Sequence, residues 1–307
     1  WGLRATNVVP VSPFYTSYTG QGIKVAILDT GFDFAHPDFA GRLIVQSSFV
    51  PGQATQDLFG HGTHCTGTAC GPKNPPGNFQ RYGIAHASQI YIGKVLNNNG
   101  SGTDGQILAG INWAFGQGCS VISLSLGAPT SSSAHSAVFE ATASNLLNAG
   151  TLIVAAAGNN SARPGTVRPV SHPANCPSIM AVGAVDSNMN IASFSNGGIF
   201  PTHGAIDIVG PGVGVFSSLS TPHSPLMGPA GIIRGNANGT SMATPHVAGI
   251  AALWAQATGL RGRNLWNKLT ATARRLPQHP VRDVGAGLVQ APTRRIWPIP
   301  VPPIVRP

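Results

Sequence analysis

The sequence predicts an α/β fold in which helices cover both faces of a mainly parallel central sheet. Short, continuously apolar runs alternate with segments of helical periodicity over most of the 307 residues. Runs that are apolar on both faces are typical of parallel strands, which crossover helices bury on each side. Neither a linker nor an internal repeat interrupts this alternation. We therefore expect one α/β domain over residues 1–290, and over 291–307 a Pro-rich tail that packs on the surface or trails from it.

The expected strands and helices follow one another along the chain. Continuously apolar runs predict the strands, at 23–28, 90–95, 121–126, 152–157 and 179–185. The helix expected over 103–117 has a capping box formed by Thr103 and Gln106, and its apolar face includes Ile107 and Ile111. Further helices are expected at 61–70, at 135–149 and from Ser241 to about 257.

The composition indicates a chain with enough hydrophobic residues to fill a substantial core. Charged residues make up only 9% of it and hydrophobic residues 42%. These proportions exclude a disordered chain, a coiled coil and a collagen. No apolar run approaches the roughly 20 residues that a membrane-spanning helix needs. The chain starts at Trp1 without an initiator Met or a signal peptide, so we interpret it as a processed, mature segment.

The chain is basic, with 18 Lys and Arg against 9 Asp and Glu, which gives a net charge of +9. Arg274–Arg275 and Arg294–Arg295 are the only adjacent cations in the sequence, and no basic run is interleaved with aromatic residues. A nucleic-acid-binding protein gathers its cations into a stripe or patch. We therefore expect no nucleic-acid partner and interpret the charge as a solvated basic surface.

Four polar residues stand where a parallel sheet places its active site, at the ends of strands and the starts of helices. Asp29 ends the first apolar strand, and Asn159 follows the strand at 152–157. His61 precedes a helix of small residues, and Ser241 opens an Ala-rich one. Together they offer the nucleophile, the base, the orienting carboxylate and the oxyanion donor of an acyl-transfer reaction.

Taken one at a time, these motifs allow other interpretations. Asp29-Thr30-Gly31 also fits a turn, or the Asp-Thr-Gly of an aspartic protease, which needs a second such Asp. His61 and His64 could bind a metal, but no Glu accompanies them as it does in the zinc proteases. Ser241 could simply cap its helix. A binding module without catalysis is a further alternative, although all four chemical groups are present.

The order Asp, His, Ser and the sequences around these residues resemble the subtilisin-like serine proteases, or subtilases. The resemblance extends from about residue 20 to residue 290. Its most specific segments are His61-Gly62-Thr63-His64 and Gly239-Thr240-Ser241-Met242-Ala243-Thr244-Pro245-His246-Val247-Ala248-Gly249. Cys65, directly after the first of these, is similar to the proteinase K branch. The resemblance implies a three-layer subtilisin-like fold and a secreted serine endopeptidase, monomeric and made with a propeptide that is later cleaved.

The resemblance also implies a role for each catalytic residue. Ser241 attacks the carbonyl carbon of the bond to be cleaved, and His61 takes its proton and passes it to the leaving amine. Asp29 holds His61 in the required tautomer and stabilises its charged form. Asn159 donates its side-chain amide to the oxyanion, beside the backbone N–H of Ser241. The expected substrates are proteins and peptides, which are cleaved through an acyl-enzyme.

Three segments are assigned to substrate binding by the same resemblance. Two of them pair with the substrate backbone as added strands. Together with the third, they wall the pocket for the side chain before the cleaved bond, called P1. The residues are Gly100, Ser101, Gly102, Ser125, Leu126, Gly127, Ala156, Ala157 and Gly158. None of them is acidic, so we expect broad specificity with apolar or aromatic P1 side chains.

Calcium, in a structural role, is the cofactor that the resemblance implies, and no catalytic cofactor is expected. Asp38 matches a calcium ligand of the family, although the loop at 74–82 departs from the family's calcium-binding loop. Asp207 matches a second cation site, whose other ligands are the backbone carbonyls of Ala174 and Cys176.

The cysteines fit no zinc pattern. Cys65 and Cys70 point about 140° apart on their helix, so we do not expect them to pair. Cys65 lies one helical turn beyond His61, which predicts a buried, non-catalytic thiol close to the base. His64 and His246 are expected to be buried packing and hydrogen-bonding groups.

Overall fold

The structure is a computed structural model that describes residues 1–10, 14–132, 134–199, 204–221 and 232–295. Its central sheet has seven strands, each parallel to its neighbours. In order across the sheet they are β3 (Ile44–Ser48), β4 (Gln89–Lys94), β2 (Lys24–Asp29), β5 (Val121–Leu124), β6 (Leu152–Ala156), β7 (Met180–Val185) and β8 (Ile208–Pro211). The predicted parallel sheet is confirmed. The two edge strands, β3 and β8, were not predicted, because both contain polar or turn-forming residues.

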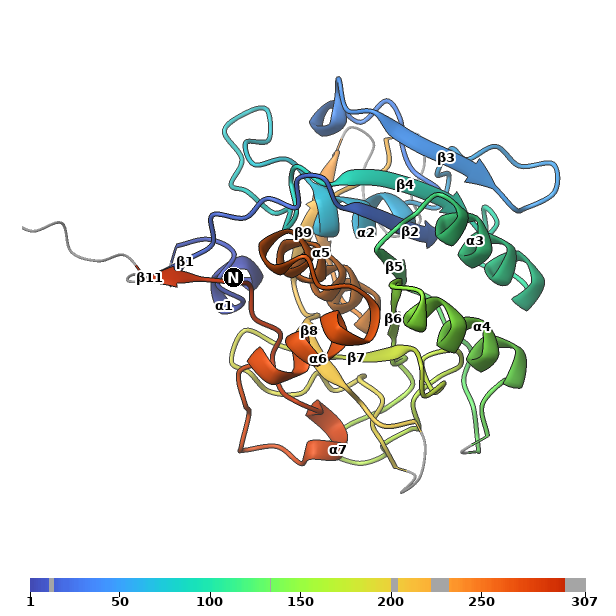
Figure 1. Ribbon diagram of the computed structural model, residues 1–307, viewed down its shortest axis with the longest axis vertical. Coiled ribbons are helices and arrows are strands. Elements are labelled where there is room, and N and C mark those ends of the chain that lie inside the picture. The colour runs from blue at the N-terminus through green and yellow to red at the C-terminus, as the bar shows by residue number, and fades with distance from the viewer. Residues whose placement is uncertain (11–13, 133, 200–203, 222–231, 296–307) are drawn as a thin grey trace, which may run out of the picture.

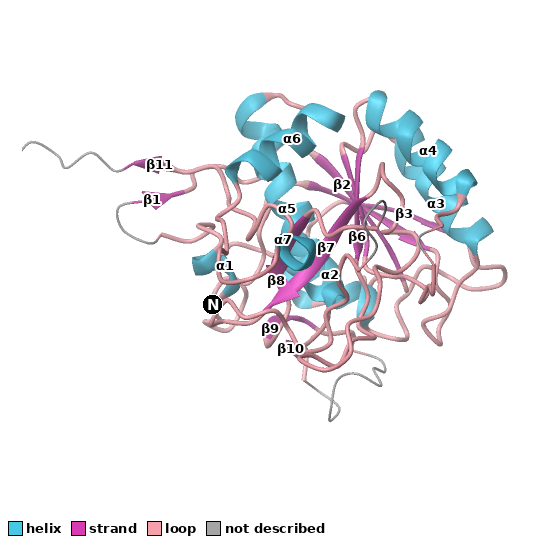
Figure 2. Cartoon of the chain, turned by 90° about the horizontal axis from the view of Figure 1, so that it is seen from below, coloured by secondary structure: helices cyan, strands magenta, loops and turns pink. Residues whose placement is uncertain are grey.

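Helices cover both faces of the sheet and make the fold three-layered, as Figure 1 and Figure 2 show. The helices on one face are α2 (His61–Cys70), α5 (Thr240–Thr258) and α6 (Gly262–Thr272). Those on the other face are α3 (Asp104–Gly116) and α4 (Ala137–Asn148). This arrangement confirms the fold class that the alternation of apolar runs and helical patterns predicts.

Strand β2 shows why its run of apolar residues is continuous. Val25 and Ile27 pack into the core beneath α2 and α5, while Ala26 and Leu28 pack into the core beneath α3. All four side chains are buried. A strand between two helical layers has no solvent face, so it needs apolar residues at every position.

Local sequence signals place the helices. The capping box of α3 is present, because the N–H of Gln106 donates to the Thr103 hydroxyl at 3.3 Å and the N–H of Thr103 donates to Gln106 Oε1 at 2.9 Å. The two longest helices on opposite faces, α3 and α5, both lie within one residue or two of their predicted ends.

The remaining elements are short and lie around the sheet. They are α1 (Gly2–Ala5), η1 (Pro37–Phe39), α7 (Val281–Val284), the antiparallel pair β9 (Val215–Ser218) and β10 (Arg234–Ala237), and the antiparallel pair β1 (Phe14–Tyr15) and β11 (Arg294–Arg295). Most of the predicted tail, residues 296–307, lies outside the described residues, and the domain boundary at 290 stays a prediction. No helix among the described residues is long and apolar enough to span a membrane.

The topology determines where a site can form. Strand β2 lies between β4 and β5, so the chain leaves β2 toward one edge of the sheet and later continues toward the other. The connections diverge at such a switch point and leave a crevice at the carboxyl ends of the strands. Asp29, the last residue of β2, stands at that crevice.

Candidate active site

The carboxylate at the end of β2 and the imidazole at the start of α2 are in direct contact. Nδ1 of His61 donates to Oδ1 of Asp29 at 2.7 Å, and the N–H of Thr30 donates to the same oxygen at 2.8 Å. The Asp29 side chain is buried. Because a carboxylate can only accept, the bond keeps a proton on Nδ1 of His61 and leaves Nε2 as an acceptor, which is the tautomer that a general base needs.

Helix α2 can approach β2 this closely because Gly62 has no side chain. A Cβ at Gly62 would lie 2.2 Å from the carbonyl oxygen of Gly31. Buried Asp57 then anchors the start of the helix, since its Oδ2 accepts from the N–H of Thr63 at 2.8 Å and from the Thr63 hydroxyl at 2.7 Å. A carboxylate at a helix N-terminus is favoured by the orphan N–H groups and the helix dipole. Asp57 therefore positions His61, a role that the sequence analysis missed.

Burial and charge act on His61 in opposite directions. Burial lowers the pKa of an imidazole, because the charged form loses its water. The carboxylate of Asp29 outweighs this effect, and the pKa of His61 is raised well above its ordinary value of 6.5. Asp29 thus favours the protonated form of His61, and burial favours the neutral form.

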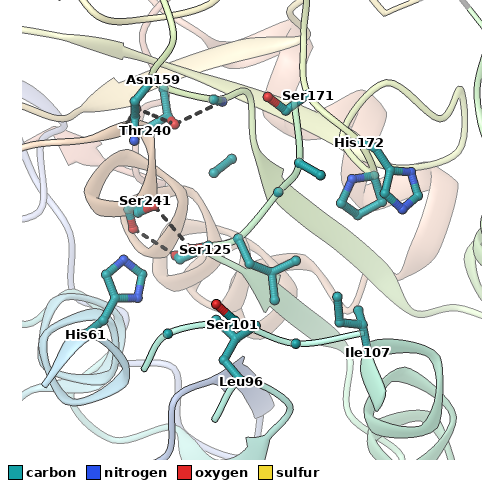
Figure 3. A pocket seen from close by; sticks show the side chains of 18 of the residues that line it. His61, Leu96, Ser101, Ile107, Ser125, Asn159, Ser171, His172, Thr240 and Ser241 are labelled. Carbon is teal, nitrogen blue, oxygen red and sulfur yellow. Dashed lines mark hydrogen bonds between the residues drawn. The ribbon is translucent and has the colours of Figure 1, made fainter. Parts of the chain in front are cut away.

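Ser241 lies on the first turn of α5, and Figure 3 shows it beside the imidazole of His61. Its hydroxyl donates to the carbonyl oxygen of Ser125 at 3.1 Å, and the Ser125 hydroxyl donates to the carbonyl oxygen of Ser241 at 2.8 Å. A nucleophile often bonds to its base only once substrate is in place. The structure thus brings the three residues of the expected triad together from β2, α2 and α5.

Asn159 lies in the loop after β6, and Thr240 determines how its amide is turned. Oδ1 of Asn159 accepts from the N–H of Thr240 at 2.8 Å and from its hydroxyl at 2.9 Å, so Nδ2 is the atom left to donate elsewhere (Figure 3). Gly239 keeps the space beside it open. Its φ is 151°, and a Cβ there would lie 3.3 Å from Asn159 Nδ2. The N–H of Ser241, in the first helical turn, has no acceptor within the helix. The two donors can serve one anion.

A cleft of about 510 Å³ runs past these groups. It is lined by eight of the nine residues expected to bind substrate, namely Gly100, Ser101, Gly102, Ser125, Leu126, Gly127, Ala156 and Gly158. Ala157 is the exception. It is fully buried in the core, and its carbonyl oxygen accepts from the N–H of Ser171 at 2.8 Å. Successive side chains of an extended chain point to opposite faces, so Ala157 points into the core while Ala156 and Gly158 reach the cleft.

The cleft also contains an acid that the expected segments did not include. Asp104 Oδ1 lies 3.4 Å from Nε2 of His172, and both residues line the cleft. Figure 3 shows His172 and Ile107 at the end of the cleft away from His61. An Asp in the first turn of a helix is ordinarily explained by the helix dipole, which hid this residue from the sequence analysis.

Comparison with known proteins shows the family. Residues 20–287 match the model of the subtilase family. The chain belongs to the subtilase family. It is a subtilisin-like hydrolase of the serine endopeptidase class.

Relatives of this subtilase are similar over most of its length. It is 41% identical to subtilisin Savinase of Lederbergia lenta, over 82% of this chain and 82% of that protein. It is 42% identical to a subtilisin of Bacillus pumilus, over 77% and 78% of the two chains. It spans 58% of the length of the M-protease of Shouchella clausii. Among solved structures, Sphericase matches with a TM-score of 0.77 at 28% identity, over 94% of this chain and 97% of that one.

The four cysteines of the subtilase are all free and buried. Sγ of Cys65 lies 3.9 Å from Nδ1 of His61 and 3.5 Å from the carbonyl oxygen of Ser241. The expected buried thiol beside the base is confirmed. Burial raises the pKa of Cys65, so it stays a thiol and does not compete as a nucleophile. With Asp29 and His61 it forms a group whose possible ligand atoms all lie within 4.8 Å of one another.

The other two histidines of the specific segments face away from the chemistry. Nε2 of His64 bonds to the carbonyl oxygen of Val215 at 3.0 Å, and Nδ1 of His246 bonds to that of Met242 at 2.8 Å. Burial lowers the pKa of each to about 4. Both therefore stay neutral and serve packing and hydrogen bonding, as expected.

The structure does not leave Asp38 free for calcium. Its buried carboxylate accepts from the guanidinium of Arg234 on both oxygens and from the hydroxyl of Tyr82. Ca²⁺ needs six to eight oxygen ligands, and a fixed positive charge in the middle of the site repels it. The expectation of a cation at Asp38 is corrected on this ground.

Asp207 is in different surroundings. Its Oδ2 accepts from the N–H of Ala181 at 2.7 Å, and burial raises its pKa to about 7. No cationic side chain of the described ranges forms an ion pair with it. The side chains of Ala174 and Cys176 belong to the same buried cluster as Ile206, the residue before Asp207. A half-buried carboxylate that has no ion-pair partner among the described residues fits a hard cation.

Proposed function

We propose that the subtilase cleaves peptide bonds through an acyl-enzyme on Ser241, with His61 as the base and Asp29 as its orienting group. The observation that carries the proposal is the 2.7 Å bond between buried Asp29 and His61, beside a serine on the first turn of α5. A serine hydroxyl is a weak nucleophile, and a base within reach is what activates it.

The proposed reaction has two halves. In the first, the oxygen of Ser241 adds to the substrate carbonyl carbon while its proton passes to Nε2 of His61, and the bond to the amine then breaks as His61 returns the proton to the leaving nitrogen. In the second, the oxygen of a water adds to the acyl carbon while His61 takes its proton. The bond between that carbon and the Ser241 oxygen then breaks as His61 returns the proton to this oxygen, which restores the hydroxyl. Asp29 stays ionised throughout and stabilises the imidazolium.

The negative charge that develops on the substrate carbonyl oxygen needs donors in place beforehand. The free amide N–H of Asn159 and the backbone N–H of Ser241 are the proposed pair. The bonds from Thr240 hold Asn159 in this orientation, so little reorganisation accompanies the reaction.

The test of this proposal is labelling with a fluorophosphonate, which reacts only with an activated serine. We expect one label per chain, on the peptide that contains Ser241, and inhibition in proportion to labelling. Inhibition by pepstatin without labelling would instead favour an aspartic protease, and neither labelling nor peptide hydrolysis would favour a binding module.

We propose broad specificity with apolar or aromatic P1 side chains. The wall of the cleft near Ser241 is made of backbone and small residues such as Ala156 and Gly158, and the acid in the cleft, Asp104, belongs to the helix that also carries Ile107 at the far end. We expect peptides with Phe or Leu at P1 to be cleaved at least about 10-fold faster than those with Lys, the selectivity that one side chain in an apolar pocket commonly gives. Relative kcat/KM on a panel of chromogenic peptides measures this, and faster cleavage after Lys or Arg contradicts it.

Mercurial compounds should inhibit the enzyme through Cys65. A mercury ion bound to Sγ, 3.9 Å from Nδ1 of His61, would disturb the bond between His61 and Asp29. We expect wild-type activity to be lost on titration with one equivalent of mercuric ion and the Cys65→Ala variant to retain it. The Cys119→Ala variant is the matched control, because Cys119 is also buried but lies outside the cleft. Equal sensitivity of Cys65→Ala and wild type would refute this role.

We propose that Asp207, with the backbone carbonyls of Ala174 and Cys176, holds a structural Ca²⁺. A ligand at about 100 times its Kd stabilises a fold by roughly 2.7 kcal/mol, which corresponds to a rise in Tm of about 5 °C. We expect CaCl₂ to raise Tm by this amount in the wild type and not in Asp207→Asn. Differential scanning fluorimetry in CaCl₂ and in EGTA measures the difference, and a calcium response that survives in Asp207→Asn rules the site out.

We further propose, from family membership, a secreted and monomeric protease made with a cleaved propeptide. Intact mass and N-terminal sequencing of the protein recovered from culture medium, together with light scattering, test these three points. Recovery from the cell interior alone, or a stable dimer, would contradict them.

A further inference from the structure

One arginine joins the loop between α2 and β4 to Asp38 and to strand β10. We infer that Arg234 is a built-in cation that takes the place of a divalent metal at Asp38, so that this loop is held without calcium. The inference does not depend on the proposed catalytic function.

Arg234, the first residue of β10, donates two parallel hydrogen bonds to the Asp38 carboxylate. Nε donates to Oδ2 at 2.8 Å and Nη2 donates to Oδ1. The side chains of Arg234 and Asp38 are 5% and 0% exposed, so the pair is shielded from solvent. A planar guanidinium matches a carboxylate in this way, whereas an ammonium group does not.

The same guanidinium reaches the loop itself. Nη2 of Arg234 also donates to the carbonyl oxygen of Pro76 at 3.2 Å, and the guanidinium lies over the ring of Phe79 at 4.2 Å. The hydroxyl of Tyr82 donates to Asp38. The guanidinium of Arg234 thus links the loop at 71–83, the carboxylate of Asp38 and strand β10. A metal ion bound at Asp38 would link the same parts of the chain.

Electrostatics around the pair disfavour an added cation. The segment 71–83 contains no acidic residue, and its charged residues are Lys73 and Arg81. Asp38 raises the pKa of Arg234, so the guanidinium stays charged at any pH at which the protein is folded. An ion with two positive charges would have to displace Arg234 and find oxygen ligands that this loop does not offer.

A built-in cation and a metal differ in one measurable respect. A bound metal stabilises in proportion to its concentration, whereas a side chain does not. The pair should therefore keep the loop closed in the presence of a chelator, and its loss should open the loop whether or not calcium is present.

The experiment uses the full chain with Ser241→Ala and Asp207→Asn, which remove self-cleavage and the other proposed cation site. We expect the same Tm in CaCl₂ and in EGTA, within about 1 °C. Adding Arg234→Met leaves the buried Asp38 charge unpaired, so we expect Tm to fall by about 5 °C or more. We also expect trypsin to cleave after exposed Lys73 about 10-fold faster, because cleavage follows the population of the open loop. Arg275→Met, at an exposed arginine, is the matched control and should change neither value.

Two results would overturn the inference. One is a rise in Tm on adding CaCl₂ that Asp38→Asn abolishes, because it would show a metal at Asp38 in spite of Arg234. The other is an Arg234→Met variant whose Tm and cleavage rate match those of Arg275→Met. If Arg234→Met does not fold, the Tm of the parent protein in CaCl₂ and in EGTA still tests the inference. Arg234→Lys is the second variant, because it keeps the charge but loses the paired bonds. We expect its Tm to lie between those of the parent protein and Arg234→Met.

Discussion

Replacing Ser241 by Ala should lower kcat by about 10⁶-fold, the size of loss that follows removal of a subtilisin's nucleophile. Without the hydroxyl no acyl-enzyme can form. Water would have to attack the substrate directly, assisted only by the oxyanion donors and by binding, and these account for a residual acceleration of about 10³–10⁴ over solution. KM should stay within a few-fold, because the walls of the cleft are unchanged. Steady-state hydrolysis of a chromogenic peptide measures both constants.

The matched control is Ser187→Ala, at an exposed serine in the turn that follows β7. It should leave kcat and KM at wild-type values. A Ser241→Ala variant that keeps more than a small fraction of wild-type kcat, after contaminating protease is excluded by active-site titration, would mean that another group is the nucleophile.

Replacing Asp29 by Asn should lower kcat by about 10⁴-fold and shift the pH profile as well. An amide can donate to Nδ1 of His61, which favours the wrong tautomer for a base. Asp29 is also what raises the pKa of His61 against the opposing effect of burial. With its charge removed, burial dominates and the pKa falls. Since the reaction needs neutral His61, the acid limb of kcat/KM should move to lower pH while the plateau drops.

The pH profile separates this role from simple misfolding. A damaged fold lowers the plateau of kcat/KM but leaves its acid limb at the same pH. Loss of the Asp29 charge moves the acid limb to lower pH. Asp186→Asn, in the turn after β7, is the control and should alter neither plateau nor limb. A limb that stays in place in Asp29→Asn would show that Asp29 does not set the pKa of His61.

Much of the fold and of the candidate site was predictable, because the signals are local. Continuous apolar runs identify the central strands, and the Thr103–Gln106 capping box identifies α3. Polar residues at the ends of such elements then point to Asp29, His61, Asn159 and Ser241, since strand ends and helix starts are where side chains can face a crevice. The edge strands β3 and β8 were not predicted, because polar or turn-forming residues interrupt their apolar runs.

What could not be predicted depends on residues that meet only in three dimensions. Asp57 anchors α2 through bonds to Thr63, and Ala157 turns into the core while its neighbours reach the cleft. Arg234 and Asp38 are 196 positions apart, so no spacing links them, yet their pairing decides that one expected calcium ligand is already neutralised.

The amino-acid sequence by itself determined which elements form and which of them carry reactive groups, because hydrophobic periodicity, capping and motif residues act over a few positions. Only the tertiary structure decided the bond between Asp29 and His61, the orientation of the Asn159 amide and the occupant of the Asp38 site. Each of these three features depends on which polar and charged groups the packing brings within bonding distance. In a low-dielectric interior such groups must be paired, and their partners come from distant parts of the chain rather than from sequence neighbours.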